Sequence, residues 1–255
     1  MDDFLKFAEG WYKLSGVDLR WYKRPQMERR LAALRDRHGY TSFEAYLRGV
    51  QADPSLQEEL VDRITINVSE FFRNPERWQT LEDFLSKLPR KTPLRAWSAA
   101  CSTGEEPYTL AIVLQQLGFT DFHILATDLD REVLDKAEQG LYRPHQTRLV
   151  PDAYLHSYFS RDEEAVRVTD SFRQRITFQQ HNLLSDQYPR SLDLIICRNV
   201  LIYLTDEAKH QVLAGLATSL RVGGYLFLGS TEQLLHAETY QMKSVAPFLY
   251  EKIRT

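Results

Sequence analysis

The chain has 255 residues, of which 43% are hydrophobic, so it can bury a large core as one domain or two. Its net charge of −3 argues against a general nucleic-acid-binding protein, because phosphate contacts require an excess of basic residues, although a local basic patch is still compatible with it. No stretch approaches the roughly 18 apolar residues of a membrane span, and the acidic start lacks a signal peptide's apolar run. The two cysteines cannot form a disulfide framework, so we expect a cytoplasmic globular protein without a metal site.

Residues 1 to about 88 have helical periodicity. Apolar residues recur every three or four positions from Met27 to Leu34, and two further helices are expected before residue 67. Asn74 is expected to cap another helix, which would have Pro75 at its first position. We therefore predict an all-α N-terminal domain over residues 1–88, with a linker to about residue 93.

From about residue 94 short apolar strands alternate with helices. The strands are predicted at 94–101, 122–128, 176–182, 192–199 and 224–230, and the helices at 105–118, 131–140 and 206–224. This alternation predicts an α/β fold in which a mostly parallel, doubly wound sheet fills residues 94–255. About forty residues break the rhythm and predict a small β insertion at about 141–176. The tail, 239–252, predicts a hairpin or an antiparallel edge strand.

Polar residues follow several of the predicted strands, where open α/β sheets bind their ligands. The segment "SAACSTGEEP" after the first strand lacks a G-x-G-x-x-G pattern, and its Glu105 and Glu106 would repel a pyrophosphate but could hold a cationic amino-acid group. Asp128 ends the second strand and suits ribose hydroxyls, while Asn182 suits a base edge. Together these residues favour S-adenosylmethionine over NAD.

Each of these features also has a structural interpretation. Acids in "STGEE" are favourable at any helix start, Asp128 could cap the helix that follows, and Asn182 could be a turn residue. The occurrence of all three features at successive strand ends is what favours a cofactor site.

The segments "NVSEFFR", "WSAACSTGEEPYTLA", "ATDLD", "HNLL" and "CRNVLIYL" resemble, in order and spacing, the CheR family of chemotaxis-receptor glutamate O-methyltransferases. The resemblance covers most of the chain. It implies a helical domain followed by a Rossmann-like methyltransferase domain with an inserted β subdomain. It also implies S-adenosylmethionine as methyl donor, S-adenosylhomocysteine as product, and glutamates on chemoreceptor cytoplasmic helices as acceptors.

The same resemblance implies a set of site residues. Those expected at the cofactor are Asn67, Ser69, Arg73, Glu106, Asp128, Asn182, Leu183, Arg198 and Asn199. Tyr203 would lie beside the reacting centre with Arg73. Position 69 is serine where some relatives have threonine, so the hydroxyl is kept. In some relatives the insertion docks a receptor's C-terminal pentapeptide, and the sequence leaves open whether it does so here.

A glutamate acceptor has a pKa near about 4.3, so it is already ionised at neutral pH and methyl transfer needs no general base. We expect the forked guanidinium of Arg73 to orient a carboxylate, of the acceptor or of the cofactor, while Phe71 and Phe72 anchor the segment in the core. The alternatives are that Arg73 pairs with an acid near a helix start and that Tyr203 is only a strand-end aromatic residue.

Residues 20–37 are strongly basic, with seven lysines and arginines against two acids: Arg20, Lys23, Arg24, Arg29, Arg30, Arg35 and Arg37 against Glu28 and Asp36. Such runs are usually solvated helix faces, but this one could also steer a glutamate-rich receptor toward a monomeric enzyme.

Other functions are compatible with parts of the sequence. A nucleic-acid N-methyltransferase is disfavoured because "CRNVLIY" has no Pro-Pro, and an NAD oxidoreductase because the glycine fingerprint is missing. A catalytically silent cofactor-binding module, or a methyltransferase of another protein, stays open, as do the identity of the modified glutamates and regulation by small ligands.

Overall fold

The computed structural model describes residues 2–90, 93–161 and 164–254, which form two compact units. The first unit runs to Asn67 and includes Tyr203–Gln211, and the second comprises Val68–Ile202 and continues from Val212. Residues 91–92 of the predicted linker and 162–163 of the predicted insertion lie outside the described residues. Of the helices described, none combines the length and apolar character that a bilayer span requires.

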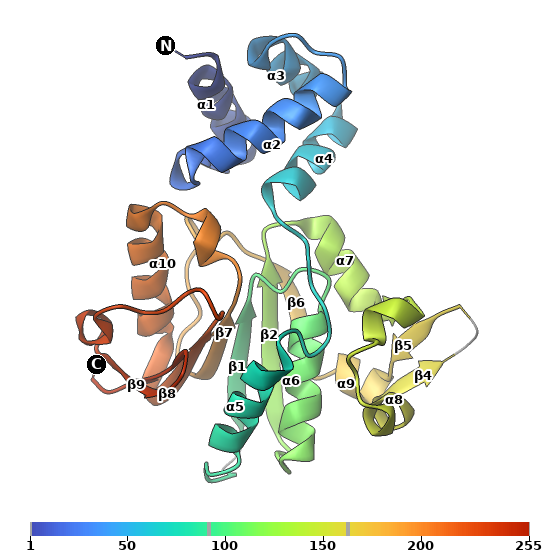
Figure 1. Cartoon of the computed structure of the whole chain (residues 1–255), viewed down its shortest axis with the longest axis vertical. Coiled ribbons are helices and arrows are strands. Elements are labelled where there is room, and N and C mark those ends of the chain that lie inside the picture. The colour runs from blue at the N-terminus through green and yellow to red at the C-terminus, as the bar shows by residue number, and fades with distance from the viewer. Residues whose placement is uncertain (1, 91–92, 162–163, 255) are drawn as a thin grey trace. The chain divides into compact units, whose positions relative to one another are not determined.

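The first unit is helical. Its helices are α1 (Asp3–Ser15), η1 (Leu19–Trp21), α2 (Arg24–Arg37), α3 (Phe43–Ala52) and α4 (Pro54–Ile64) (Figure 1). The ring of Phe7 stacks on that of Tyr46 at 5.7 Å in the core. The segment 203–205 joins this unit through backbone hydrogen bonds of 2.9 Å, one from Lys23 N–H to the Tyr203 carbonyl and one from Thr205 N–H to the Trp21 carbonyl.

The second unit is built on a seven-stranded sheet. Its strands are β1 (Leu94–Ala99), β2 (Phe122–Asp128), β6 (Ile176–Gln180), β7 (Leu192–Cys197), β8 (Leu220–Leu228), β9 (Met242–Ala246) and β10 (Leu249–Lys252), in the order β6-β2-β1-β7-β8-β10-β9. The first five in that order pair in parallel, and β10 is antiparallel to both β8 and β9. The predicted doubly wound fold is confirmed, and the tail forms the predicted hairpin.

The connections between strands locate the ligand-binding edge of the sheet. From β1 the chain passes through α6 (Glu105–Gln116) to β2, and α7 (Arg131–Gln139) follows; from β7 it passes through α10 (Asp206–Ser219) to β8, on the other side of β1. Crossovers between parallel strands are right-handed, and these two run toward opposite edges of the sheet. They therefore place α6 and the second half of α10 on opposite faces of the sheet. The order therefore reverses between β1 and β7, whose carboxyl ends form the crevice where ligands bind in this class of sheet.

One strand begins earlier than predicted. The predicted helix runs to residue 224, but α10 ends at Ser219 and β8 begins at Leu220, which pairs with Leu192. The pairing register shifts after this point, and Gly223 adopts a left-handed φ of 77°. Two successive glycines are typical of a helix end, but Gly223 and Gly224 instead accommodate an irregularity inside β8.

The predicted β insertion is present as a separate three-stranded antiparallel sheet. It is formed by β3 (Leu141–Tyr142), β5 (Val166–Val168) and β4 (Phe159–Arg161), in that order, with η2 (Pro144–Thr147), α8 (Asp152–Tyr158) and α9 (Asp170–Arg173) around it.

The position of α5 (Pro75–Leu85) differs from the predicted grouping. Its buried Trp78, Leu81 and Leu85 belong to the core of the second unit, so the compact units divide at Asn67 and not near residue 88. Helical periodicity shows that a helix has a buried face but not which core receives that face. Whether residues 1–88 fold independently stays a prediction.

Candidate cofactor site

The loop after β1 turns sharply. Ala100, Ser102 and Gly104 have φ angles of 63°, 50° and 92°, in the left-handed region. At Gly104 a Cβ atom would lie 2.8 Å from the Cβ of Ala137, so only glycine fits there. The loop thus brings backbone, rather than side chains, to the end of β1. Ser102 is buried, and its hydroxyl has no hydrogen-bond partner in the described part of the chain.

Asp128, at the end of β2, is tied to this loop. Its Oδ2 accepts the N–H of Ser102 at 2.8 Å and its Oδ1 accepts the N–H of Asp130 at 3.1 Å. Asp130, and not Asp128, caps α7, through the N–H of Glu132. Burial raises the pKa of Asp128 to about 6. Each carboxylate oxygen has a second lone pair, so the group retains acceptor capacity for hydroxyl donors.

The two acids at the start of α6 have different environments. Glu105 is fully buried and accepts hydrogen bonds from Thr103 Oγ1 at 2.6 Å and from Gln146 Nε2 at 3.5 Å. It therefore connects the loop to the insertion instead of facing a ligand. Glu106 accepts from Ser98 Oγ at 2.8 Å and forms an ion pair with Arg198. The expectation that both acids present negative charge to a cationic group does not hold for Glu105.

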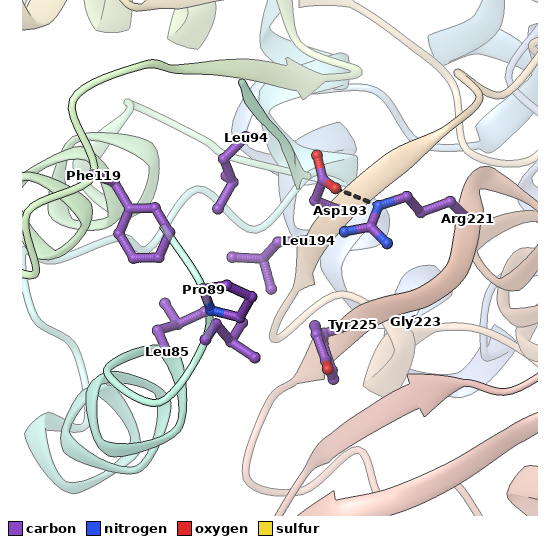
Figure 2. A pocket seen from close by; sticks show the side chains of 10 residues that line it. Leu85, Pro89, Leu94, Phe119, Asp193, Leu194, Arg221, Gly223 and Tyr225 are labelled. Carbon is purple, nitrogen blue, oxygen red and sulfur yellow. Dashed lines mark hydrogen bonds and ion pairs between the residues drawn. The ribbon is translucent and has the colours of Figure 1, made fainter. Parts of the chain in front are cut away.

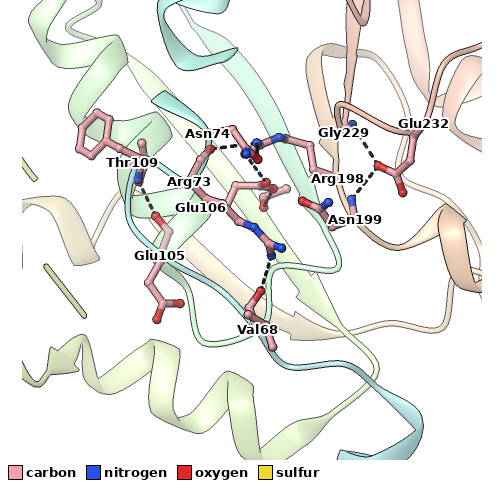
Figure 3. Close-up of polar contacts among 12 residues, drawn as sticks. Val68, Arg73, Asn74, Glu105, Glu106, Thr109, Arg198, Asn199, Gly229 and Glu232 are labelled. Atoms are coloured by element: carbon pink, nitrogen blue, oxygen red, sulfur yellow. Dashed lines mark hydrogen bonds and ion pairs between the residues drawn. The ribbon is translucent and has the colours of Figure 1, made fainter. Parts of the chain in front are cut away.

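Arg198, directly after β7, connects three segments of the site (Figure 3). Its Nη1 lies 3.5 Å from Glu106 Oε2, and its Nη2 donates to the Arg73 carbonyl at 2.9 Å and to Asn74 Oδ1 at 3.1 Å. Its guanidinium also lies over the ring of Trp78 at 5.6 Å. Burial lowers the pKa of Arg198, and the carboxylate of Glu106 opposes that shift.

Asn74 therefore has a different role from the one predicted. It occupies the N-cap position of α5 with Pro75 next to it, but its φ of 59° is left-handed and its side chain makes no capping hydrogen bond. The side-chain oxygen accepts from Arg198 instead. A bond to a charged donor has replaced the cap, and sequence pattern alone does not distinguish the two.

The segment 68–74 is held by its aromatic residues. The ring of Phe71 is fully buried between Tyr142 and Phe159 of the insertion, at 4.8 and 5.4 Å. Phe72 is buried with a left-handed φ of 53°, which is rare for a bulky residue and is retained only where the surroundings enforce it. Arg73 extends from this fixed backbone, and its Nη1 donates to the Val68 carbonyl at 2.6 Å, so the observed partner is not an acid.

Asn182 lies beyond the end of β6 in a turn. Its side-chain oxygen accepts the N–H of Leu184 at 2.9 Å, and its own N–H donates to Asp186 at 2.8 Å. Asn182 is thus a turn residue, which is the structural alternative to a contact with a base edge. Leu183 is partly exposed, and its carbonyl accepts the hydroxyl of Tyr188 at 2.5 Å.

Arg198 contacts both Glu106, through its side chain, and Arg73, through the backbone carbonyl of Arg73. The predicted residues Asn67 and Tyr203 belong to the first unit, where Asn67 Nδ2 donates to Asp62 at 3.1 Å. Their proximity to the remaining site residues stays a prediction, as does each cofactor contact.

Two polar residues were missed by the sequence analysis. Ser98 is fully buried and donates to Glu106, and Glu232 is 6% exposed and binds backbone N–H groups after β7. A serine inside an otherwise apolar strand was a usable signal for Ser98. No short-range pattern connects Glu232 to a segment about thirty residues earlier in the chain.

Comparison with known proteins identifies the family. Residues 67–248 match the model described as CheR methyltransferase, SAM binding domain, and residues 2–65 match CheR methyltransferase, all-alpha domain. The chain belongs to the CheR methyltransferase family. It is therefore an S-adenosylmethionine-dependent methyltransferase, and S-adenosylmethionine is its cofactor.

Similar CheR proteins span nearly the whole chain. "Chemotaxis protein methyltransferase" of Listeria monocytogenes is 40% identical over 98% of this chain and 97% of its own. "Chemotaxis protein methyltransferase 2" of Pseudomonas aeruginosa is 35% identical, covering 98% and 92%. "Chemotaxis protein methyltransferase" of Escherichia coli is 33% identical, covering 92% and 85%.

The residues at this edge suit the CheR cofactor. A ribose requires acceptors such as Asp128, and a cofactor with both a carboxylate and an amino group requires donors and acceptors together. The buried Ser102 hydroxyl and Arg198 Nε, which lack hydrogen-bond partners among the described residues, provide polar atoms for such a ligand.

Proposed function

We propose that this CheR family member methylates glutamate side chains on the cytoplasmic helices of chemoreceptors, giving glutamyl methyl esters for chemotactic adaptation. The main support is similarity over nearly the full chain to proteins named chemotaxis protein methyltransferase. We further propose that it acts as a cytoplasmic monomer; both cysteines are free and buried, which suits a reducing compartment.

Methyl transfer requires the protein to position the reacting groups rather than to transfer a proton. S-adenosylmethionine supplies the methyl group on a positively charged sulfonium. The acceptor glutamate is ionised at neutral pH, so its oxygen is already nucleophilic. What the chain has to supply is alignment of that oxygen, and placement of this kind is worth up to roughly 7–11 kcal/mol.

We propose that Arg73 provides part of this alignment. The buried rings of Phe71 and Phe72 anchor the backbone just before it, and its contact with Val68 uses one of the five N–H donors of a guanidinium. The planar fork can therefore still engage a carboxylate in two-point fashion. A very tight pair with the nucleophile would also stabilise the ground state, so Arg73 should orient the carboxylate without neutralising it. Tyr203 is proposed to pack beside the transferred methyl group.

The receptor-facing surface is proposed to be a part of α2. Four of the seven basic residues between 20 and 37 form ion pairs inside the first unit, through Arg20, Arg24, Arg35 and Arg37. Arg29 is exposed, and Arg30 is half-buried near Arg63, whose charge helps burial lower the pKa of Arg30. We propose that Arg29 and Arg30 attract acidic receptor helices.

The deciding experiment is incubation with a radiolabelled methyl donor and purified receptor cytoplasmic fragments. Base-labile label on receptor glutamates is the expected result, because a glutamyl methyl ester is hydrolysed by base. Binding of S-adenosylhomocysteine without any receptor labelling would contradict the proposal and favour the silent module or another protein substrate.

A further inference from the structure

Glu232 lies in the turn after β8, and its carboxylate binds backbone N–H groups from two neighbouring strand ends. Oε2 accepts from Asn199 at 2.6 Å and from Gly229 at 3.0 Å, and Oε1 accepts from Leu201 at 2.7 Å. Figure 3 shows Glu232 pointing from its own segment toward Asn199. β7 and β8 are adjacent here, because Cys197 pairs with Leu228. One side chain therefore ties together the segments that leave these two strands.

These contacts exceed those of an ordinary turn acid. Such an acid binds neighbours within two or three residues and stays exposed. Glu232, by contrast, is only 6% exposed, and its partners Leu201 and Asn199 lie 31 and 33 residues away in sequence. A buried carboxylate with three N–H donors is well satisfied, and the donors are satisfied in turn.

The segment held by Glu232 is one that needs support. Asn199 adopts a left-handed φ of 62°, and Arg198 immediately before it carries the ion pair with Glu106. Asparagine adopts this conformation more readily than most residues, but it remains uncommon and surrounding contacts help to stabilise it. The carboxylate of Glu232 is the contact that fixes the Asn199 amide.

We propose that Glu232 is a positioning residue for the cofactor site, which fixes the backbone after β7 so that Arg198 and Asn199 are held ready before S-adenosylmethionine binds. This inference rests on the proposed assignment of Arg198 and Asn199 to that site. Holding a binding segment in its bound conformation strengthens binding because less ordering remains to be done when the ligand arrives.

The first test is Glu232→Gln, which preserves shape but replaces one acceptor oxygen by an N–H₂ group. At least one backbone N–H then faces another donor, whichever way the amide is oriented. We expect binding of S-adenosylhomocysteine, measured by calorimetry, to weaken roughly tenfold. The KM for S-adenosylmethionine should rise by a similar factor, with a much smaller change in kcat.

The second test, Gly229→Ala, leaves every charge in place. A Cβ at this position would lie 2.3 Å from Glu232 Oε2 and 3.0 Å from the Asn199 nitrogen, so the carboxylate is displaced. We expect the same weakening of S-adenosylhomocysteine binding, and this variant keeps the proposal testable if Glu232→Gln does not fold.

Asp193 provides a matched control at the opposite end of β7. It accepts the N–H of Arg95 at 2.7 Å and pairs with Arg221 at the edge of a cavity of about 260 Å³, which is also lined by Leu85 and Tyr225 (Figure 2). Asp193→Asn likewise removes a carboxylate that holds backbone, but away from the proposed site. It should lower the melting temperature and leave S-adenosylhomocysteine affinity unchanged.

Wild-type affinity in folded Glu232→Gln and Gly229→Ala would overturn the positioning role. Equal weakening in Asp193→Asn would also overturn it, since general destabilisation would then explain the effect. Asn199→Gly keeps the left-handed backbone and removes only the side chain. Wild-type affinity in that variant would contradict the assignment of Asn199 to the site, whatever the Glu232 variants do.

Discussion

Arg198 and Glu106 form a buried ion pair, with 3.5 Å between Nη1 and Oε2, that joins the end of β7 to the first turn of α6. Removal of one partner leaves the other charge buried without compensation. We therefore expect Glu106→Gln to lower the free energy of unfolding by about 3 kcal/mol, measured by urea denaturation. The double variant Glu106→Gln with Arg198→Met should regain part of this loss, because it removes both charges. A single variant as stable as wild type would contradict the expectation.

Arg73→Ala should lower kcat roughly 100-fold, because the acceptor is no longer aligned. The bond to Arg198 uses only the carbonyl of Arg73, and the side chain makes one exposed hydrogen bond, to Val68, so the melting temperature should fall only slightly. Arg73→Lys keeps the charge but loses the fork, and should give an intermediate rate. Wild-type turnover in the lysine variant would rule out the orienting role.

The raised pKa of Asp128 predicts a pH dependence of cofactor binding. An ionised carboxylate accepts hydroxyl donors better than a protonated one, so affinity for S-adenosylhomocysteine should be constant above about pH 7 and fall about tenfold per unit below about pH 6. Calorimetry across this range tests it. In Asp128→Asn the loss of S-adenosylhomocysteine affinity below about pH 6 should be absent. If that variant lost affinity with pH as the wild type does, the pH dependence would belong to another group.

The raised pKa of Asp128 affects folding stability in the opposite direction from cofactor binding: a lower pH favours the folded state. The pKa of Asp128 in the folded chain is about 6, above the ordinary 3.8, so the folded state binds this proton more tightly than the unfolded chain. Asp128 therefore contributes stability at low pH that is lost as the pH rises through about 6. Denaturation of wild type and Asp128→Asn at pH 5 and pH 8 should show this contribution as a difference between the two proteins.

Gly104→Ala should be more damaging than other substitutions at left-handed glycines. The new Cβ would lie 2.8 Å from Ala137 Cβ. In addition, alanine in the left-handed backbone conformation costs about 1–2 kcal/mol. Gly16→Ala is the control, because its φ of 74° is similar and an added Cβ meets no described atom within 4 Å. Chemical denaturation should show a clearly larger loss at Gly104, together with weaker S-adenosylhomocysteine binding. Equal losses would mean that the loop can relax.

Charge reversal on α2 should weaken receptor binding. We expect Arg29→Glu with Arg30→Glu to reduce affinity for receptor fragments about tenfold at low ionic strength, and wild-type binding to weaken as salt is added. Arg48→Glu on α3 makes the same kind of change at a residue already paired with Glu44, and should have a smaller effect. Receptor binding that is independent of salt would contradict a role for these charges.

Much of the fold could be predicted because its signals are local. Apolar runs located β1, β2, β6 and β7, and polar residues after them, such as Asp128, predicted a cofactor site at that edge, whereas Arg198 was assigned by the family resemblance. The partners of those residues could not be predicted in the same way. Asn74 was interpreted as a cap because cap residues are recognised by neighbours in sequence, whereas its partner Arg198 is 124 residues away. The burial of Glu105 depends on an insertion whose placement the sequence pattern does not show.

The packing of Phe71 against Tyr142 and Phe159 has a consequence for engineering chimaeras within this family. Tyr142 lies in β3 and Phe159 in β4, so an exchange of the insertion between relatives would also change the rings that hold Phe71, two residues before Arg73. A transplanted module that lacks either ring would loosen Arg73 even though it contains no residue of the proposed active site.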